Sequence, residues 1–269
     1  MNIRLKEIEF SATLEALTVQ NNGIIMINTI NAHSYNLARK DNEFAKALLQ
    51  SDVLLPDGES IVKATRLLRG DSIKRIAGWD LFEFEMIKLN SAASLGKNKV
   101  LFLGSTIEVL TKIKEKAAKQ YPHVAVHTYS PPYKPEFNEE DNQAMIDAIN
   151  NVNPDVLFIG MTAPKQEKWA WKLVNGQLIS ENRKSNEIED ILNPSLYNQL
   201  SNTVNCHICC IGAVFDFYAG TVKRAPLWWQ LNGLEWLYRF LKEPTRMWRR
   251  YLVGNVKFIW YILLEKILK

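Results

Sequence analysis

The chain has 269 residues, of which 47% are hydrophobic and 23% charged, and its formal net charge is +4. This composition predicts a folded protein with a sizeable core and excludes extended disorder. So mild a charge does not by itself indicate nucleic-acid binding. All three cysteines, Cys206, Cys209 and Cys210, fall in one apolar run, which indicates a reducing compartment without a disulfide framework. The N-terminal residues mix acids and bases, so no signal peptide is expected.

Short β-branched runs alternate with longer helical patterns along the chain, which is typical of βαβ units and a mainly parallel sheet. We therefore predict an α/β, Rossmann-like fold with flanking helices. The predicted strands are 23–28, 53–55, 99–103, 124–128, 155–159 and 208–211. Helices are predicted from 31 to about 40, from 58 to about 68, over 79–89, 106–120 and 139–150, and after Gly160 with Pro164 in the first turn.

Two segments break this alternation. Residues 175–205 are polar and rich in Asn, Ser and Glu, which predicts a surface insertion. From Leu227 onward, tryptophans alternate with basic residues, a composition that suits a membrane interface. We expect an α/β core over 1–226 and a helical, membrane-associating appendage over 227–269. The apolar pattern after Tyr251 is too short and too interrupted for a spanning helix, so it would lie on the membrane.

The tetrapeptide Leu55-Pro56-Asp57-Gly58 places a carboxylate on a tight turn between a short strand and a helix. Strand-end loops are where ligands bind in open α/β sheets, so Asp57 is a candidate catalytic base. Pro-Asp-Gly is also an ordinary turn-forming sequence, and that structural interpretation stays open.

Two further strand-to-helix turns, at Gly104-Ser105-Thr106 and Gly160-Met161-Thr162, present small residues at helix N-termini, where backbone N–H groups attract anions. Such turns are common in α/β folds whether or not they bind phosphate. The chain has no P-loop, and no Gly-x-Gly-x-x-Gly follows the first strand, which counts against an ATPase and a dinucleotide dehydrogenase. A nucleotide-sugar substrate requires neither the P-loop nor the Gly-x-Gly-x-x-Gly motif.

Six motifs together resemble the bacterial WecG/TagA/CpsF glycosyltransferase family and occur in its order. They are Thr29-Ile30-Asn31-Ala32, Leu55-Pro56-Asp57-Gly58, Lys74-Arg75-Ile76-Ala77-Gly78-Trp79-Asp80, Pro164-Lys165-Gln166-Glu167, Arg224-Ala225-Pro226 and Gly233-Leu234-Glu235-Trp236-Leu237-Tyr238-Arg239. The resemblance implies an inverting transferase that moves a hexose or N-acetylhexosamine, N-acetylmannosamine above all, from a UDP-sugar to an undecaprenyl-diphosphate-linked sugar. It implies cell-surface polysaccharide synthesis, of a teichoic acid-like polymer or an exopolysaccharide, at the inner face of the cytoplasmic membrane, by a peripheral and self-associating protein.

The resemblance also implies roles for individual residues. Asp57 would be the base that takes the proton of the acceptor hydroxyl. Substrate contacts fall on Thr29, Asn31, Arg75 and Gln166, and lipid-diphosphate contacts on Arg239, Arg246 and Arg249. Those last three would share one face of a continuous helix, which Pro244 is expected to interrupt.

Each assignment has a structural alternative. Thr29 and Asn31 could cap a helix, Arg75 could form a surface ion pair, and Gln166 could be an exposed helical residue. The rival acids Asp80 and Glu167 have structural explanations, as a cap and as a complement to the helix dipole.

We expect no metal and no other cofactor. Asp-x-Asp is absent from the plausible loops, and the cluster Cys206-His207-Ile208-Cys209-Cys210 has no second half for a zinc site.

Two other functions remain open from the sequence alone. The first is a nucleotide-sugar enzyme with a soluble acceptor, and the second is a non-catalytic lipid- or nucleic-acid-binding module built on the basic, aromatic tail. Nucleic acid is not an expected partner under the main interpretation.

Overall fold

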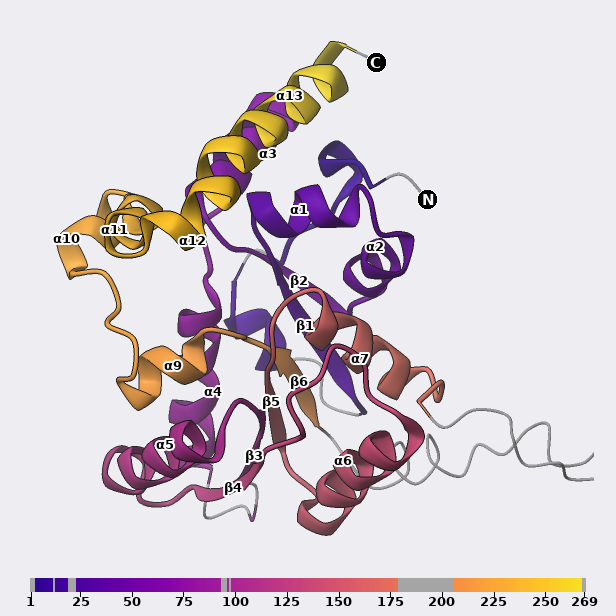
Figure 1. Ribbon diagram of the computed structural model, residues 1–269, viewed down its shortest axis with the longest axis vertical. Coiled ribbons are helices and arrows are strands. Elements are labelled where there is room, and N and C mark those ends of the chain that lie inside the picture. The colour runs from indigo at the N-terminus through magenta and orange to yellow at the C-terminus, as the bar shows by residue number, and fades with distance from the viewer. Residues whose placement is uncertain are drawn as a thin grey trace, which may run out of the picture.

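A computed structural model describes residues 3–11, 13–18, 23–92, 96, 98–178 and 206–267. At its centre lies a six-stranded, fully parallel sheet with the order β2-β1-β6-β5-β3-β4 (Figure 1). The strands are β1 Ile25–Ile30, β2 Val53–Pro56, β3 Lys99–Gly104, β4 Ala125–Tyr129, β5 Val156–Gly160 and β6 His207–Cys210. The predicted α/β, Rossmann-like class is confirmed, and most of the predicted insertion, residues 179–205, lies outside the described residues.

Side-chain alternation along the strands creates two cores. On β3, Val100 and Phe102 face one core, whereas Leu101 and Leu103 face the other. The first core is covered by α4 (Gly78–Ser91), α5 (Ile107–Gln120) and α9 (Val214–Ala219). The second is covered by α6 (Glu139–Val152) and α7 (Lys165–Val174). Because all strands are parallel, their carboxyl ends open along one edge of the sheet, where ligands bind in such folds.

The N-terminal third contains one helix more than was predicted. The helix expected from Asn31 to about Lys40 is α1 (Ala32–Ala38), and a second helix, α2 (Asn42–Leu49), follows it. The Asp41 carboxylate starts α2 by accepting hydrogen bonds from the backbone N–H groups of Glu43 and Phe44, both at 3.0 Å. These helices share a third core with α3 (Glu59–Arg69) and η1 (Leu5–Glu7); η2 spans Glu15–Thr18.

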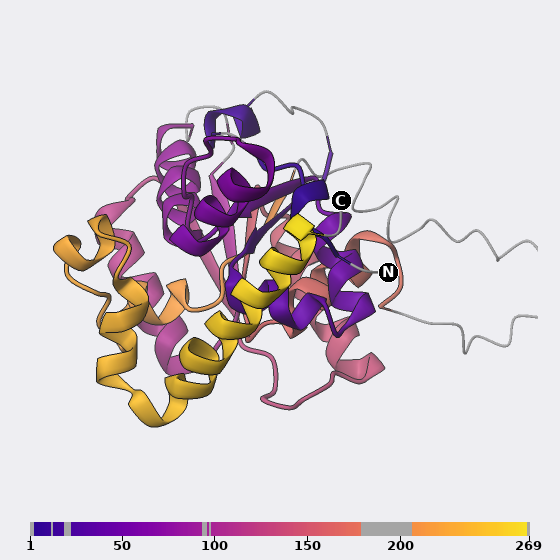
Figure 2. The same ribbon diagram turned by 90° about the horizontal axis from the view of Figure 1, so that it is seen from above.

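The described part of the C-terminal appendage, residues 227–267, consists of short helices followed by a long one. They are α10 (Leu227–Leu231), α11 (Glu235–Lys242), α12 (Pro244–Trp248), the π-helical η5 (Arg249–Val253) and α13 (Gly254–Ile267). The expected interruption is confirmed, since α11 ends at Lys242 and Pro244 begins α12. The short helices extend to one side of the sheet, and α13 then runs beside α1 and α3 (Figures 1 and 2). In the described part of the chain, no helix combines the length and apolarity needed to cross a bilayer.

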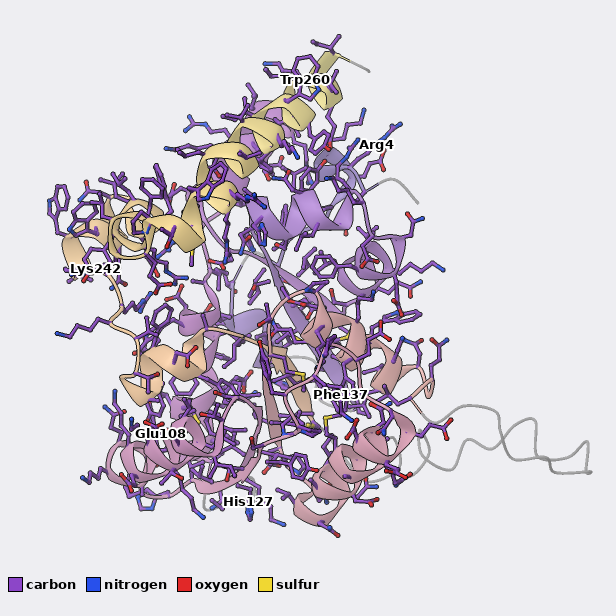
Figure 3. The ribbon with its side chains drawn as sticks, in the orientation of Figure 1. Arg4, Glu108, His127, Phe137, Lys242 and Trp260 are labelled. Carbon is purple, nitrogen blue, oxygen red and sulfur yellow. The ribbon has the colours of Figure 1, made fainter. Side chains whose placement is uncertain are left out.

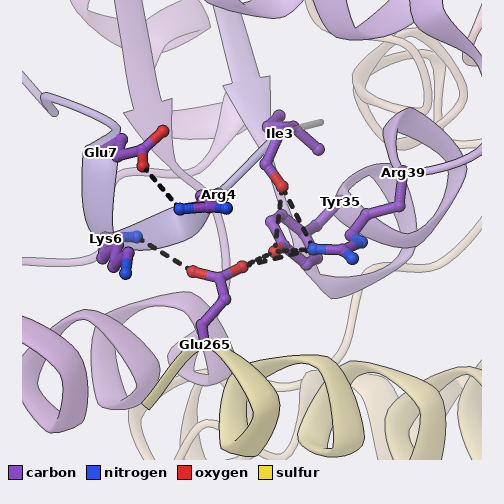
Figure 4. A network of polar contacts seen from close by, with 7 residues as sticks. All are labelled: Ile3, Arg4, Lys6, Glu7, Tyr35, Arg39 and Glu265. Atoms are coloured by element: carbon purple, nitrogen blue, oxygen red, sulfur yellow. Dashed lines mark hydrogen bonds and ion pairs between the residues drawn. The ribbon is translucent and has the colours of Figure 1, made fainter. Parts of the chain in front are cut away.

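A buried carboxylate fastens α13 to the core (Figure 4). Glu265 accepts hydrogen bonds from the Tyr35 hydroxyl on α1 and, at 3.2 Å, from the backbone N–H of Lys6. Arg39 approaches the same carboxylate at 3.6 Å, and the Glu265 side chain is only 5% exposed. Burial, together with the nearby Glu265 charge, raises the pKa of Tyr35, so this phenol stays a hydrogen-bond donor. Phe258 and Ile262 complete the contact by entering the third core.

Replacing Glu265 by alanine is expected to destabilise the protein by about 2–4 kcal/mol, because Tyr35, Arg39 and the Lys6 N–H all lose their contact with a buried carboxylate. Urea unfolding followed by circular dichroism measures the loss. The neighbouring exposed residue gives the control, since Lys266→Ala should stay within about 0.5 kcal/mol of the parent protein. Equal stability of the Glu265→Ala and Lys266→Ala proteins would contradict a stabilising role for the network.

Candidate active site

Asp57 lies on a turn that three backbone features fix in place. Its own N–H donates to the Ile30 carbonyl at the end of β1, at 2.9 Å, and the Ile76 N–H donates to the Pro56 carbonyl at 3.0 Å. Gly58 follows with a φ of 109°, in a region that L side chains rarely adopt, so this glycine allows the chain to turn into α3. The half-buried Asp57 is therefore held at the carboxyl edge of the sheet, between β1 and the 71–77 segment.

Asn31 joins α1 to this carboxylate. Its Oδ1 accepts the backbone N–H groups of His33 and Ser34 at 3.0 and 3.1 Å, so the predicted capping role is confirmed. With Oδ1 occupied, the amide nitrogen is the donor of the hydrogen bond that Asn31 makes to Asp57. Thr29, half-buried on β1, pairs in register with Leu55 two residues before the aspartate.

Charges from two distant segments surround Asp57. The Glu235 carboxylate of α11 lies 3.8 Å from Arg75 and 2.9 Å from Arg239. Burial raises the pKa of Asp57 above its usual range, and the Glu235 charge raises it further. Arg239, Arg75 and the Asn31 hydrogen bond oppose this rise. The result is a carboxylate whose basicity exceeds that of an exposed aspartate, which favours a role in proton transfer.

Gln166 lies at the start of α7 after β5, which is three positions along the sheet from β2, and it is buried rather than exposed. Its Oε1 accepts the Met161 N–H at 3.1 Å, and its Nε2 donates to Glu167 at 2.9 Å. Gly212 packs on the amide, since a Cβ there would lie 3.4 Å from Oε1. Gln166 thus orders the turn after β5 at the same edge of the sheet as Asp57.

The two other acids differ from each other. Asp80 accepts the Ala77 N–H at 2.7 Å at the start of α4, so its predicted capping role is confirmed. Glu167 also lies in a first helical turn, where the dipole favours the charged form, but it is 3% exposed. Burial outweighs its hydrogen bonds and raises the pKa of Glu167 to about 7. Its Oε2 is buried without a hydrogen-bond partner among the described residues.

Glu167→Gln is expected to raise stability at pH 8 by up to about 3 kcal/mol, with little difference at pH 4.5. The folded-state pKa of about 7 exceeds the unfolded value near 4.5, so wild-type stability falls as pH rises across that window. Glutamine does not ionise and escapes this loss. Urea unfolding at several pH values measures the difference, with the exposed Glu115→Gln as control. A gain that is the same at every pH would contradict an ionisation effect.

The two glycine turns serve close packing. A Cβ at Gly104 would lie 2.4 Å from the Gly160 carbonyl oxygen, and one at Gly160 would lie 2.5 Å from the Phe215 ring. Both glycines are therefore required by the sheet itself. Thr106 caps α5 by accepting the Val109 N–H at 3.3 Å. These contacts explain the small residues without a phosphate.

The predicted lipid-diphosphate arginines occupy different helices. Arg239 is on α11 beside Asp57, and Arg249, exposed in η5, lies over the Trp248 ring at 5.3 Å. The side chain of Arg246 lies outside the described part of the structure. Arg249 and His33 line a small pocket between α1 and the appendage, of about 140 Å³. The three arginines do not share one continuous helical face.

Two charged residues of this region were not predicted to have a role. Glu235 joins the two arginines. Arg224 lies over the Trp79 ring at 4.8 Å, where burial lowers its pKa and the charge of Glu235 opposes that shift. Both belong to motifs noted in the sequence, and that membership was the available signal. Among the residues that the structure describes, no three His, Cys, Asp or Glu side chains gather as metal ligands would.

The "Glycosyl transferase WecG/TagA/CpsF family" profile matches residues 1–179 and 195–269 of this chain. The chain is also similar to proteins named N-acetylglucosaminyldiphosphoundecaprenol N-acetyl-beta-D-mannosaminyltransferase. That of Bacillus subtilis (strain 168) is 28% identical, over 84% of this chain and 75% of that protein. That of Bacillus spizizenii is 28% identical, over 90% of this chain and 80% of that protein. That of Staphylococcus aureus (strain MW2) is 27% identical, over 89% of this chain and 78% of that protein.

Proposed function

This chain belongs to the WecG/TagA/CpsF glycosyltransferase family, and from that premise we propose which sugar it transfers and how. The donor is a UDP-sugar of the N-acetylmannosamine type, and the acceptor is an undecaprenyl-diphosphate-linked sugar of N-acetylglucosamine type. The names of the relatives support both the transferred sugar and the acceptor. The observation that carries the proposal is the basic Asp57 carboxylate, with arginines from the core and the appendage beside it.

The reaction is a single displacement. Asp57 takes the proton of an acceptor hydroxyl while that oxygen attacks the anomeric carbon of the donor sugar. The bond from this carbon to the diphosphate breaks, and the nucleoside diphosphate leaves with the bonding electrons. Attack opposite the leaving group inverts the anomeric configuration. One base and no second carboxylate nucleophile are needed for this route.

The arginines neutralise phosphate charge. Arg75, from the 71–77 segment beside the Asp57 turn, serves the donor diphosphate, with Thr29, Asn31 and Gln166 as further substrate contacts. Arg239, with Arg246 and Arg249, serves the lipid diphosphate. Guanidinium groups suit both roles because they pair with phosphate through two parallel hydrogen bonds.

The appendage, 227–269, would bring this site to the inner face of the cytoplasmic membrane as a peripheral segment, while α13 stays packed on the 1–226 core. Lys242 and Trp260 point outward from it (Figure 3). Exposed apolar side chains extend from α10 to α13, a distribution typical of interfacial helices. They are Leu227, Trp228, Trp236, Leu241, Trp248, Leu252, Val253, Val256, Ile259, Trp260, Leu263 and Ile267.

Release of nucleoside diphosphate tests the proposed function. A panel of UDP-sugars is incubated with the protein in detergent, with and without polyprenyl-diphosphate-GlcNAc, and with EDTA. Release that requires the acceptor and survives EDTA is expected with UDP-N-acetylmannosamine. Release without acceptor would indicate hydrolysis, release with a soluble sugar acceptor would indicate a different transferase, and no release from any donor would overturn the proposal.

A further inference from the structure

Glu235 connects the core and the appendage through a single carboxylate. Its Oε2 lies 3.8 Å from Nη1 of Arg75, and its Oε1 lies 2.9 Å from Nη2 of Arg239. Each oxygen therefore serves a different arginine. All three side chains are partly buried, with Glu235 only 17% exposed, so solvent screens these pairs less than it screens surface ion pairs.

Backbone packing fixes the place of this carboxylate. Gly233, two residues earlier, has a φ of 68° and lies against the first turn of α3. A Cβ at this position would come within 2.5 Å of Cγ of Glu59, so only glycine permits the approach. The start of α11 is thereby seated directly after the Asp57 turn. Glu235 does not depend on the two ion pairs alone for its position.

Opposite charges meet around Glu235. Arg75 and Arg239 bring two positive charges, and Asp57 and Glu235 bring two negative ones. Without Glu235, no carboxylate would join Arg75 to Arg239, and of the two only Arg239 would keep a described ring contact, with Phe217 at 4.5 Å. Each guanidinium has five N–H donors, so one contact with Glu235 leaves most of them free to bind phosphate oxygens.

We propose that Glu235 is a positioning residue that holds Arg75 and Arg239 as a pair. It fixes the orientation of the two guanidinium groups, of which Arg75 binds the donor and Arg239 the lipid acceptor. The inference rests on the glycosyl transfer proposed above and adds to it a residue that touches neither substrate. Arg75 comes from the donor side and Arg239 from the acceptor side. Glu235 therefore couples the binding of the two substrates.

Glu235→Gln tests this role, because glutamine keeps the shape and removes the charge. We expect KM for donor and acceptor each to rise about tenfold, with an unchanged melting temperature. The acid limb of the kcat/KM profile should move to lower pH, because loss of a neighbouring negative charge lowers the pKa of Asp57. The other charges that act on Asp57, those of Arg75 and Arg239, are retained in this variant.

Glu59→Gln is the matched control. Glu59 contacts Gly233 at the same junction, and it forms no ion pair among the described residues, so its replacement removes a nearby charge without releasing an arginine. Its KM values and acid limb should match those of wild type. In an Arg239→Ala background, Glu235→Gln should raise the KM values much less than it does in wild type. Such non-additivity is expected of two residues that act through each other.

Binding of inorganic diphosphate, measured by calorimetry, needs no turnover and separates this inference from the proposed function. Weaker diphosphate binding by Glu235→Gln supports the pairing, even if no UDP-sugar is turned over by the wild-type protein. An active wild-type enzyme with unchanged KM values, acid limb and diphosphate affinity in Glu235→Gln would overturn the inference and leave the proposed function standing.

Discussion

Asp57→Asn is expected to lower kcat by about 10²–10⁴-fold, the range that general-base catalysis contributes. Asparagine keeps the size of the side chain and the contact with Asn31, but it does not accept the proton of the acceptor hydroxyl. Nucleotide affinity should survive, because the arginines remain. Turnover is measured at saturating donor and acceptor, and UDP affinity by calorimetry.

Asp80→Asn provides the comparison for this variant. Asp80 belongs to the motif 74–80, its carboxylate caps α4, and it is not among the charges that act on Asp57. Its loss should reduce stability and leave kcat within about threefold. An Asp57→Asn enzyme with the turnover of wild type would show that another group is the base. The pH profile gives an independent check, since activity should fall with decreasing pH at a value above the usual pKa of aspartate.

Arg239→Ala is expected to lower kcat/KM for the lipid acceptor by about 10²–10³-fold, the loss that corresponds to one or two charge-assisted hydrogen bonds to phosphate. KM for the donor should change far less. The loss also removes the ion pair with Glu235 and the stacking of Arg239 on the Phe217 ring at 4.5 Å, so melting temperature is measured alongside.

Lys242→Ala is the control for Arg239. Lys242 carries the same charge three residues later on α11, but it is exposed and lies 5.8 Å from the Tyr238 ring centre. In detergent its loss should change kcat/KM by less than about threefold. Equal losses for Lys242→Ala and Arg239→Ala would indicate a general electrostatic attraction instead of a specific phosphate contact.

Local signals in the sequence predicted the elements that depend on neighbouring residues. The alternation of β-branched runs predicted all six strands, and Pro244 predicted the interruption between α11 and α12. The helix α1 was predicted to within two residues of its end, whereas α2 was not predicted, although Asp41 is a good capping residue at its start.

Interactions between distant residues were beyond local signals. Glu235 and Asp57 are brought together because Gly233, just before α11, lies against Glu59 of α3, a contact that no periodicity encodes. The burial of Gln166 and Glu167 likewise depends on β6 and on Gly212, which follow after a long polar insertion. A helix-dipole argument for Glu167 considers its own helix alone, whereas burial by other elements determines its pKa.

The contact between Glu265 and the backbone of Lys6 spans 259 positions of the chain. During synthesis this contact cannot form until the last helical turns have left the ribosome, and contacts of such long range are also the slowest to close. The sheet and the Asp57 turn can therefore be complete while α13 is still unattached. A nascent chain would therefore have the Asp57 turn in place before its appendage is attached to α1 and the N-terminal segment.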